Sequence, residues 1–210
     1  MKSRISMSFA LMAMLATAGQ AQAWQTRGQT GGGVAVVAIT AQEQDDVSYM
    51  REEEKLAHDI YLDYKAMWGG VVFDNIATSE ARHFDAIGRL LTRYGVPDPA
   101  QPYPGNFLNG DLQAMYADLI DRGSASLSDA LTAGGWVEEV DIGDLANAMA
   151  ATTKPDLLKT YANLQCGSRN HLRTFALNLT ALGVAYEAQV LPQEQVDQIL
   201  ALPVEACGRF

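Results

Sequence analysis

The stretch Ser79-Glu80-Ala81-Arg82-His83 places a carboxylate and an imidazole three residues apart within a helical pattern. Apolar residues surround this stretch at intervals of three, four and seven: Ile76, Ile87, Leu90 and Tyr94. At that spacing, Glu80 and His83 share the inward face of one helix with those apolar residues. A charged group on a buried face is costly unless it is paired, protonated or bound to a metal ion. The stretch therefore predicts a helix over residues 74–95 whose buried face carries ligand-type side chains.

Three other amphipathic segments also carry ligand-type side chains on their apolar faces. Residues 46–68, a segment from 126 or 128 to about 149, and residues 153–183 each repeat apolar residues at intervals of three and four. The polar members of their inward stripes are Glu54, Glu138, Asp141 and His171. Short helices are expected at 111–122 and 192–202, and no run of alternating strands is present. The fold class expected is all-α: four long helices in a bundle, with a short extra helix in the crossover between the second and third.

Carboxylates that converge in one core repel each other, and a pair of metal ions would remove that repulsion. Carboxylate oxygen and imidazole nitrogen suit iron, manganese or zinc. Ferritin-like bundles hold two ions with one Glu from each of two helices and a Glu-x-x-His from each of the other two. Glu54, Glu80 with His83, Glu138 and His171 follow in that order. The sequence therefore predicts a ferritin-like four-helix bundle with a di-metal site for two iron ions, with manganese or zinc as the alternatives.

One position departs from this pattern. Ser168 stands three residues before His171, where a second Glu-x-x-His would have its glutamate. A serine hydroxyl is a poor ligand for iron or manganese, so the site lacks one carboxylate. Asp141 or Glu139 would compensate, or a single ion would bind through the remaining ligands. Glu52 and His58 lie off the inward stripe and are expected on the surface.

The start of the chain resembles a secretory signal peptide. Lys2 and Arg4 precede a short apolar run at 9–18, and Ala21-Gln22-Ala23 fits a cleavage site. The alternative is a membrane anchor, but the apolar run is too short to span a bilayer. We expect a signal peptide at 1–23, a flexible leader at 24–44 and the bundle domain at 45–205. A protein of this kind would be periplasmic or secreted, with no membrane association after cleavage.

The net charge and the cysteine content limit which partners the protein is expected to have. The net charge is −10 and no basic run occurs, so nucleic acid is not an expected partner. Cys166 and Cys207 are the two cysteines, and after export they would form a disulfide or remain two independent buried thiols. The expected partners are metal ions, and a homodimer remains an open alternative.

The sequence also resembles the DUF2202 group of ferritin-like proteins, which is related more distantly to rubrerythrin and ferritin. The motifs that carry the resemblance are Tyr49-Met50-Arg51-Glu52-Glu53-Glu54-Lys55-Leu56-Ala57, Ser79-Glu80-Ala81-Arg82-His83, Val137-Glu138-Glu139-Val140-Asp141-Ile142 and Gly167-Ser168-Arg169-Asn170-His171-Leu172-Arg173. In rubrerythrin-like proteins the first ligand Glu is followed by a small residue at +3 and Tyr at +7, as Glu54 is by Ala57 and Tyr61. The resemblance implies a ferritin-like bundle, with Tyr61 as a hydrogen-bond donor or radical partner beside the metal.

Three functions fit these observations. The first is an exported di-iron or manganese oxidoreductase, of the ferroxidase or peroxidase type, that reacts with peroxide, dioxygen or Fe(II). The second is a non-enzymatic carrier or binder of iron or zinc with a single occupied site. The third is a structural bundle whose carboxylates are protonated and hold no metal. Whether the protein is an enzyme is left open by the sequence.

Overall fold

In a computed structural model, residues 38–208 are described. They contain six α-helices and no strand: α1 (Ala41–Trp68), α2 (Val71–Tyr94), α3 (Gly110–Gly123), α4 (Leu127–Ala150), α5 (Pro155–Ala181) and α6 (Gln193–Ala201). The all-α prediction is confirmed for this range. None of these helices combines the length and apolarity needed to cross a membrane. The predicted signal peptide at 1–23 and most of the predicted leader lie outside the described residues.

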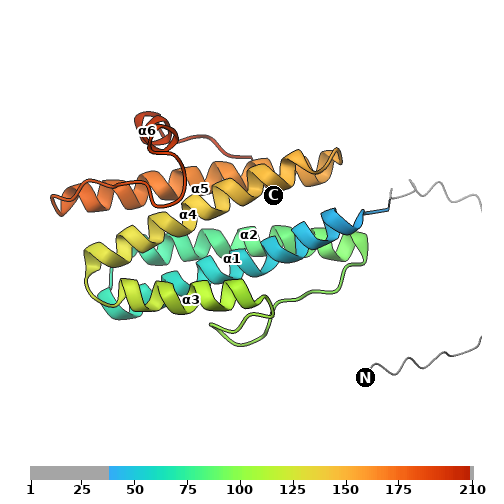
Figure 1. The fold of residues 1–210 in the computed structure, drawn as a ribbon, viewed down its shortest axis with the longest axis horizontal. Helices are drawn as coiled ribbons and strands as arrows, with labels where there is room; N and C mark the ends of the chain where they lie inside the picture. The colour runs from blue at the N-terminus through green and yellow to red at the C-terminus, as the bar shows by residue number, and fades with distance from the viewer. Residues whose placement is uncertain (1–37, 209–210) are drawn as a thin grey trace, which may run out of the picture. The chain divides into compact units, whose positions relative to one another are not determined.

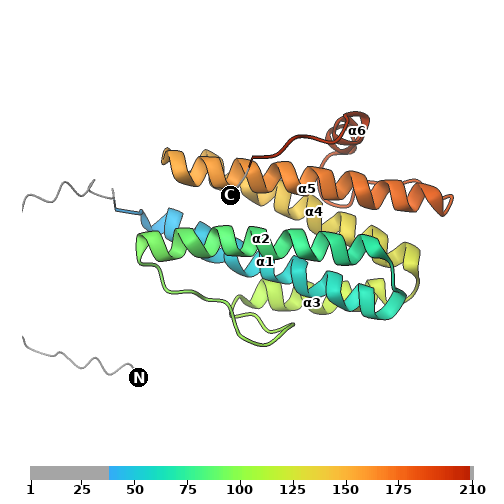
Figure 2. The same ribbon diagram turned by 180° about the vertical axis from the view of Figure 1, so that it is seen from behind.

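The four long helices form a bundle of two helical hairpins. Gly69 and Gly70 join α1 to α2, and residues 151–154 join α4 to α5. Within each hairpin the two helices pack along their length, and the hairpins meet through α1 against α4 and α2 against α5. Figure 1 shows α3 beside α1 and α4, reached through the long connection at 95–109, and Figure 2 shows the same arrangement from behind. The predicted short helix between the second and third long helices is therefore present.

The helix ends follow local capping chemistry more closely than the predicted bounds. Helix α1 begins at Ala41 rather than at 46, because Thr40 and Glu43 form a capping box. Helix α2 begins at Val71 after Gly70, so the predicted start at residue 74 is wrong. Of the two predicted starts of α4, the one at 126 agrees with the structure, because the Ser126 side chain caps the helix by accepting a hydrogen bond from the Asp129 backbone N–H.

Two apolar clusters fill the bundle on either side of a polar region. One includes Tyr61, Tyr64, Phe73 and Phe175, and the other includes Met50, Ile87, Leu91 and Leu164. Along α1, α2 and α5, residues of the first cluster lie on one side of the ligand-type residues and residues of the second on the other. Burial of this apolar surface supplies the main driving force for folding. The clusters thereby hold the polar region at the centre of the bundle.

Helix α1 is buried on more than its predicted face. Glu52 is only 3% exposed, and its carboxylate accepts hydrogen bonds from the backbone N–H groups of Leu108 (2.5 Å) and Asn109 (3.0 Å). The expectation that Glu52 is exposed is wrong, because the connection before α3 covers that side of α1. His58 is partly exposed, as expected, and its Nδ1 lies 3.0 Å from the Asp59 carboxylate.

Glu43 ties the start of α1 to the connection between α4 and α5. Its carboxylate accepts hydrogen bonds from the Thr40 backbone N–H (2.8 Å) and the Thr152 hydroxyl (2.6 Å), and lies 3.2 Å from Lys154 Nζ. Burial alone would raise the pKa of Glu43, but the hydrogen bond from Thr152 and the other contacts lower it to about 2. The carboxylate therefore stabilises the fold in its ionised form.

We expect Glu43→Gln to lower the free energy of unfolding at pH 7 by about 1–3 kcal/mol, because it weakens charge-assisted hydrogen bonds. A folded-state pKa below the ordinary value of 4.5 gives stability that is present above pH 4.5 and lost as the pH falls through about 2. Urea unfolding at several pH values should show the difference between the two proteins narrowing over that interval. A difference independent of pH would contradict the assigned role.

Candidate metal centre

Four helices bring six ligand-type residues together at the centre of the bundle. Each of these residues is no more than 9% exposed. We call this group the polar cluster; its members are Glu54 on α1, Glu80 and His83 on α2, Glu138 and Asp141 on α4, and His171 on α5. All six were predicted as metal ligands from the phase of their helices, and the structure places them in one region.

Glu80 is shared between two halves of the polar cluster. Its Oε2 lies 2.6 Å from His83 Nδ1, and its Oε1 lies 2.6 Å from His171 Nδ1. His83 Nδ1 is 3.3 Å from Glu54 Oε2, and His171 Nδ1 is 3.5 Å from Glu138 Oε2. Two sets of three follow, Glu54/Glu80/His83 and Glu80/Glu138/His171, and within each set the ligand atoms lie within 4.8 Å of one another. Each set can hold a metal ion, with Glu80 common to both.

Asp141 lies beside these two sets rather than within them. The fully buried Ser168 hydroxyl is hydrogen-bonded to Asp141 Oδ2 and lies 3.0 Å from the Leu164 carbonyl oxygen. Asp141 Oδ1 is buried and makes no hydrogen bond. Burial, and then the charge of Glu54, raise the pKa of Asp141 well above its ordinary value. Ser168 therefore positions a carboxylate from α4 near the place where the pattern would put one on α5.

Glu139, the other residue considered for that role, points elsewhere. Its carboxylate accepts hydrogen bonds from the Tyr186 hydroxyl (2.6 Å) and the backbone N–H groups of Gln189 (2.9 Å), Val190 (2.7 Å) and Leu191 (2.7 Å). Glu139 thus anchors the connection between α5 and α6. Of the two alternatives, Asp141 is the one that lies at the polar cluster.

Tyr61 fixes the orientation of one carboxylate of the polar cluster. Its hydroxyl donates to Glu138 Oε1 at 2.5 Å and lies 3.2 Å from the Gly134 carbonyl oxygen. The ring is fully buried, and burial followed by the charge of Glu138 raises the pKa of Tyr61 well above its ordinary value. The phenol therefore stays neutral and donates a hydrogen bond to Glu138 Oε1, while Glu138 Oε2 faces His171.

The pKa shifts of the polar cluster show that its buried carboxylates strongly favour positive charge beside them. Burial opposes ionisation of Glu80, yet the charges of His171 and His83 hold its pKa well below the ordinary value. Burial would lower the pKa of His171, but Glu80 and Glu138 raise it to about 10. Burial raises the pKa of Glu54 to about 7 despite the nearby His83. Protons and metal ions therefore compete for the same donor atoms.

Two residues of this region were not identified from the sequence as part of it. Glu53 is 2% exposed, and burial and the neighbouring Asp141 raise its pKa well above the ordinary value. The second residue is Gly167, and α5 continues through it. A Cβ atom at this position would lie 2.7 Å from His83 Cε1 and 2.8 Å from His83 Nε2. Gly167 therefore permits His83 to lie against the backbone of α5, which only the contact between two helices reveals.

We expect Gly167→Ala to lower the free energy of unfolding by about 1–3 kcal/mol, because the added methyl group must displace the His83 ring. Gly143→Ala is the matched control on α4, since a Cβ there would meet only Leu191 Cδ2 at 3.8 Å. The control should gain up to about 1 kcal/mol from helix propensity. Urea unfolding of both variants measures the contrast, and equal effects would show that the contact at Gly167 is unimportant.

Comparisons with known proteins agree with the motifs. The family model described as "Uncharacterized protein domain (DUF2202)" matches residues 43–203. The uncharacterized protein MJ0754 of Methanocaldococcus jannaschii is 38% identical over 168 residues, which cover 80% of this chain and 91% of that protein. The crystal structure of hypothetical protein MJ0754 is similar with a TM-score of 0.79 and 36% identity, covering 83% of this chain and 100% of that chain. The chain therefore belongs to the DUF2202 family.

Proposed function

We propose that this protein binds two divalent metal ions at the polar cluster, within a ferritin-like bundle formed by α1, α2, α4 and α5. The observation that carries the proposal is the position of Glu80, whose two carboxylate oxygens each face a separate histidine and a separate further carboxylate. A carboxylate placed in this way would supply a ligand atom to each of two ions, while Glu54 with His83 and Glu138 with His171 would complete one set each.

The donor atoms and their charge support this proposal. Three glutamates and two histidines offer oxygen and nitrogen donors of the kind that bind iron, manganese and zinc. With Asp141, the polar cluster contains four carboxyl groups, whose full ionisation two divalent ions would balance. Buried carboxylates without such compensation carry a large desolvation cost. Iron is the metal we favour, because redox-active di-iron sites use this mixture of ligands in bundles of this type.

Export of the chain belongs to the same proposal. Residues 1–23 have the charge, apolar run and cleavage pattern of a signal peptide. The structure contains a Cys166–Cys207 disulfide, and such bonds persist mainly in oxidising compartments such as the periplasm. These two observations support a periplasmic or secreted protein whose mature chain begins at Trp24.

We expect purified protein loaded with Mn(II) or Zn(II) to retain two ions per chain, and Glu80→Gln to lose most of both. Glu54→Gln and Glu138→Gln should each weaken the binding of one ion, because each removes a ligand from only one set of three. Glu194→Gln on the exposed face of α6 is the control and should bind as the parent does. Elemental analysis after dialysis measures the stoichiometry.

Two outcomes would contradict the proposal. Wild-type protein that retains no ion after loading would exclude a metal centre, and Glu80→Gln retaining two tightly bound ions would exclude a bridging role. Circular dichroism and thermal unfolding of every variant distinguish a lost ligand from a lost fold.

Oxidation of Fe(II) is a second candidate function, favoured by the buried Tyr61 hydroxyl on Glu138. Two ferrous ions would each lose one electron, and one hydrogen peroxide with two protons would become two waters. The chain's own contribution would be to hold both ions close together, exclude bulk water and keep Glu138 oriented through Tyr61. In this function iron is the substrate as well as the bound ion.

We expect Tyr61→Phe to bind two Fe(II) ions but to oxidise them more slowly with peroxide, by about tenfold, because Glu138 loses its fixed orientation. Stopped-flow absorbance of Fe(III) formation measures the rate. Tyr64→Phe is the control, because Tyr64 is also fully buried but donates to the Leu119 carbonyl oxygen. Equal rates in Tyr61→Phe, Tyr64→Phe and the parent would argue against a role for Tyr61, and no oxidation beyond free iron in solution would exclude this function.

A further inference from the structure

The histidine side of the polar cluster opens into a pocket. The pocket has a volume of about 570 Å³ and lies between α2, α5 and the segment that follows α6. His83 and His171 both line it, whereas Glu54, Glu80 and Glu138 do not. His171 is 9% exposed and those three glutamates are 2% exposed. Solvent therefore approaches the polar cluster from its histidine side.

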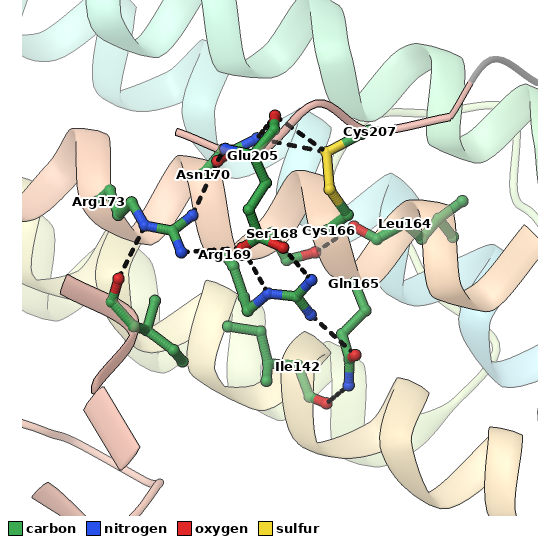
Figure 3. Close-up of polar contacts among 11 residues, drawn as sticks. Ile142, Leu164, Gln165, Cys166, Ser168, Arg169, Asn170, Arg173, Glu205 and Cys207 are labelled. Carbon is green, nitrogen blue, oxygen red and sulfur yellow. Dashed lines mark hydrogen bonds and ion pairs between the residues drawn. A yellow bond between two sulfur atoms is a disulfide. The ribbon is translucent and has the colours of Figure 1, made fainter. Parts of the chain in front are cut away.

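One wall of this pocket is the segment 202–208, which we call the tail. Its residues Glu205, Cys207 and Gly208 line the pocket. Figure 3 shows the tail running alongside α5, where Cys207 forms a disulfide with Cys166, the residue before Gly167. The disulfide thus attaches the tail to α5 one residue away from the glycine that contacts His83.

Polar contacts hold the tail on α5 as well. The Glu205 carboxylate pairs with Arg169 (2.5 Å) and Arg173 (2.8 Å), and Asn170 exchanges hydrogen bonds with the Glu205 backbone (Figure 3). The hydrogen bond from Arg169 is the largest influence on Glu205 and, with Arg173, lowers the pKa of Glu205 to about 2. These contacts fix where the tail lies when it is tethered.

The disulfide is the strongest tether of the tail. None of the residues 202–208 is buried, and the apolar side chains of Leu202 and Val204 are 58% and 73% exposed. The tail therefore has no buried apolar anchor, and its other attachments are the ion pairs and hydrogen bonds of Glu205 and Asn170. A disulfide that closes a long loop restricts the chain far more than such pairs do. Breaking it would leave the tail held only by the contacts of Glu205 and Asn170.

We propose that the pocket is the route by which metal ions reach the polar cluster and that the disulfide-tethered tail controls passage through it. The proposal rests on the metal-binding function proposed above and adds its regulation. With the Cys166–Cys207 bond intact, the tail stays against α5 and narrows access to His171. With the bond reduced, the tail moves away from the pocket and ions exchange faster.

A dithiol or two monothiols supply the reduction. One thiolate attacks the sulfur of Cys207, which lines the pocket and is more accessible than the buried Cys166. The S–S bond breaks, and a second thiol resolves the mixed disulfide. Two electrons and two protons pass to the protein, which gains two thiols, and the reductant leaves as its disulfide.

The test compares Zn(II) release from the oxidised protein and from the double variant Cys166→Ser/Cys207→Ser, which needs no reductant. Both are loaded with Zn(II), their stoichiometry is measured, and release to an excess of a chromophoric chelator is followed by stopped flow. We expect equal stoichiometry and release at least about tenfold faster from the double variant, because the tether is gone. Backbone hydrogen exchange of residues 204–208 should accelerate in the double variant.

A control separates this effect from general loss of stability. Leu119→Ala truncates a fully buried residue of α3, away from the tail, and should destabilise the bundle without faster Zn(II) release. Equal release rates from the oxidised protein and the double variant would overturn the proposal, as would equal acceleration by Leu119→Ala. An oxidised protein that binds no Zn(II), Mn(II) or Fe(II) would instead refute the metal-binding function itself.

Discussion

The Glu80 carboxylate, held between His83 and His171, is the interaction on which the rest of this structure depends. It joins α2 to α5, and so connects the two helical hairpins at the centre of the bundle. Its burial would be prohibitively costly without positive charge on both sides. The two apolar clusters exclude water from the region and thereby strengthen the attraction between the Glu80 carboxylate and positive charge. The same features make the centre suited to cations.

Several residues act by holding the polar cluster in place. Tyr61 orients Glu138, Ser168 orients Asp141, and Gly167 allows His83 to approach α5. Changing partners of this kind typically costs a metal site about 10- to 100-fold in affinity or activity. The serine that breaks the expected Glu-x-x-His pattern therefore has a role, since it supports a carboxylate supplied by another helix. The proposed site therefore keeps the negative charge of a fourth carboxyl group, although α5 supplies one ligand fewer.

What could be predicted from the sequence was what local periodicity determines. The phase of Glu54, Glu80, Glu138 and His171 within their apolar stripes identified the buried faces, and those faces meet in the structure. Glu52 was misassigned because its burial depends on the connection before α3, which is distant in sequence. The start of α2 was misplaced for a local reason, since the chain turns at Gly69-Gly70 and the helix resumes before Asp74.

Other features needed three dimensions. The choice between Asp141 and Glu139 depended on which way each points, since both lie on α4. The pairing of Cys166 with Cys207 stayed open until α6 and the tail were seen to fold back onto α5. Gly167 carries no sequence signal beyond an unexpected glycine in a long helix, because its partner His83 lies on another helix.

The most direct test of a bridged two-ion centre is anomalous diffraction from crystals of the protein soaked in Mn(II). The account predicts two peaks, one on each side of Glu80, separated by about 3.5–4 Å as in other two-metal sites. One peak should lie near Glu54 and His83, and the other near Glu138 and His171. A single peak, or full occupancy at a place away from Glu80, would contradict the central claim.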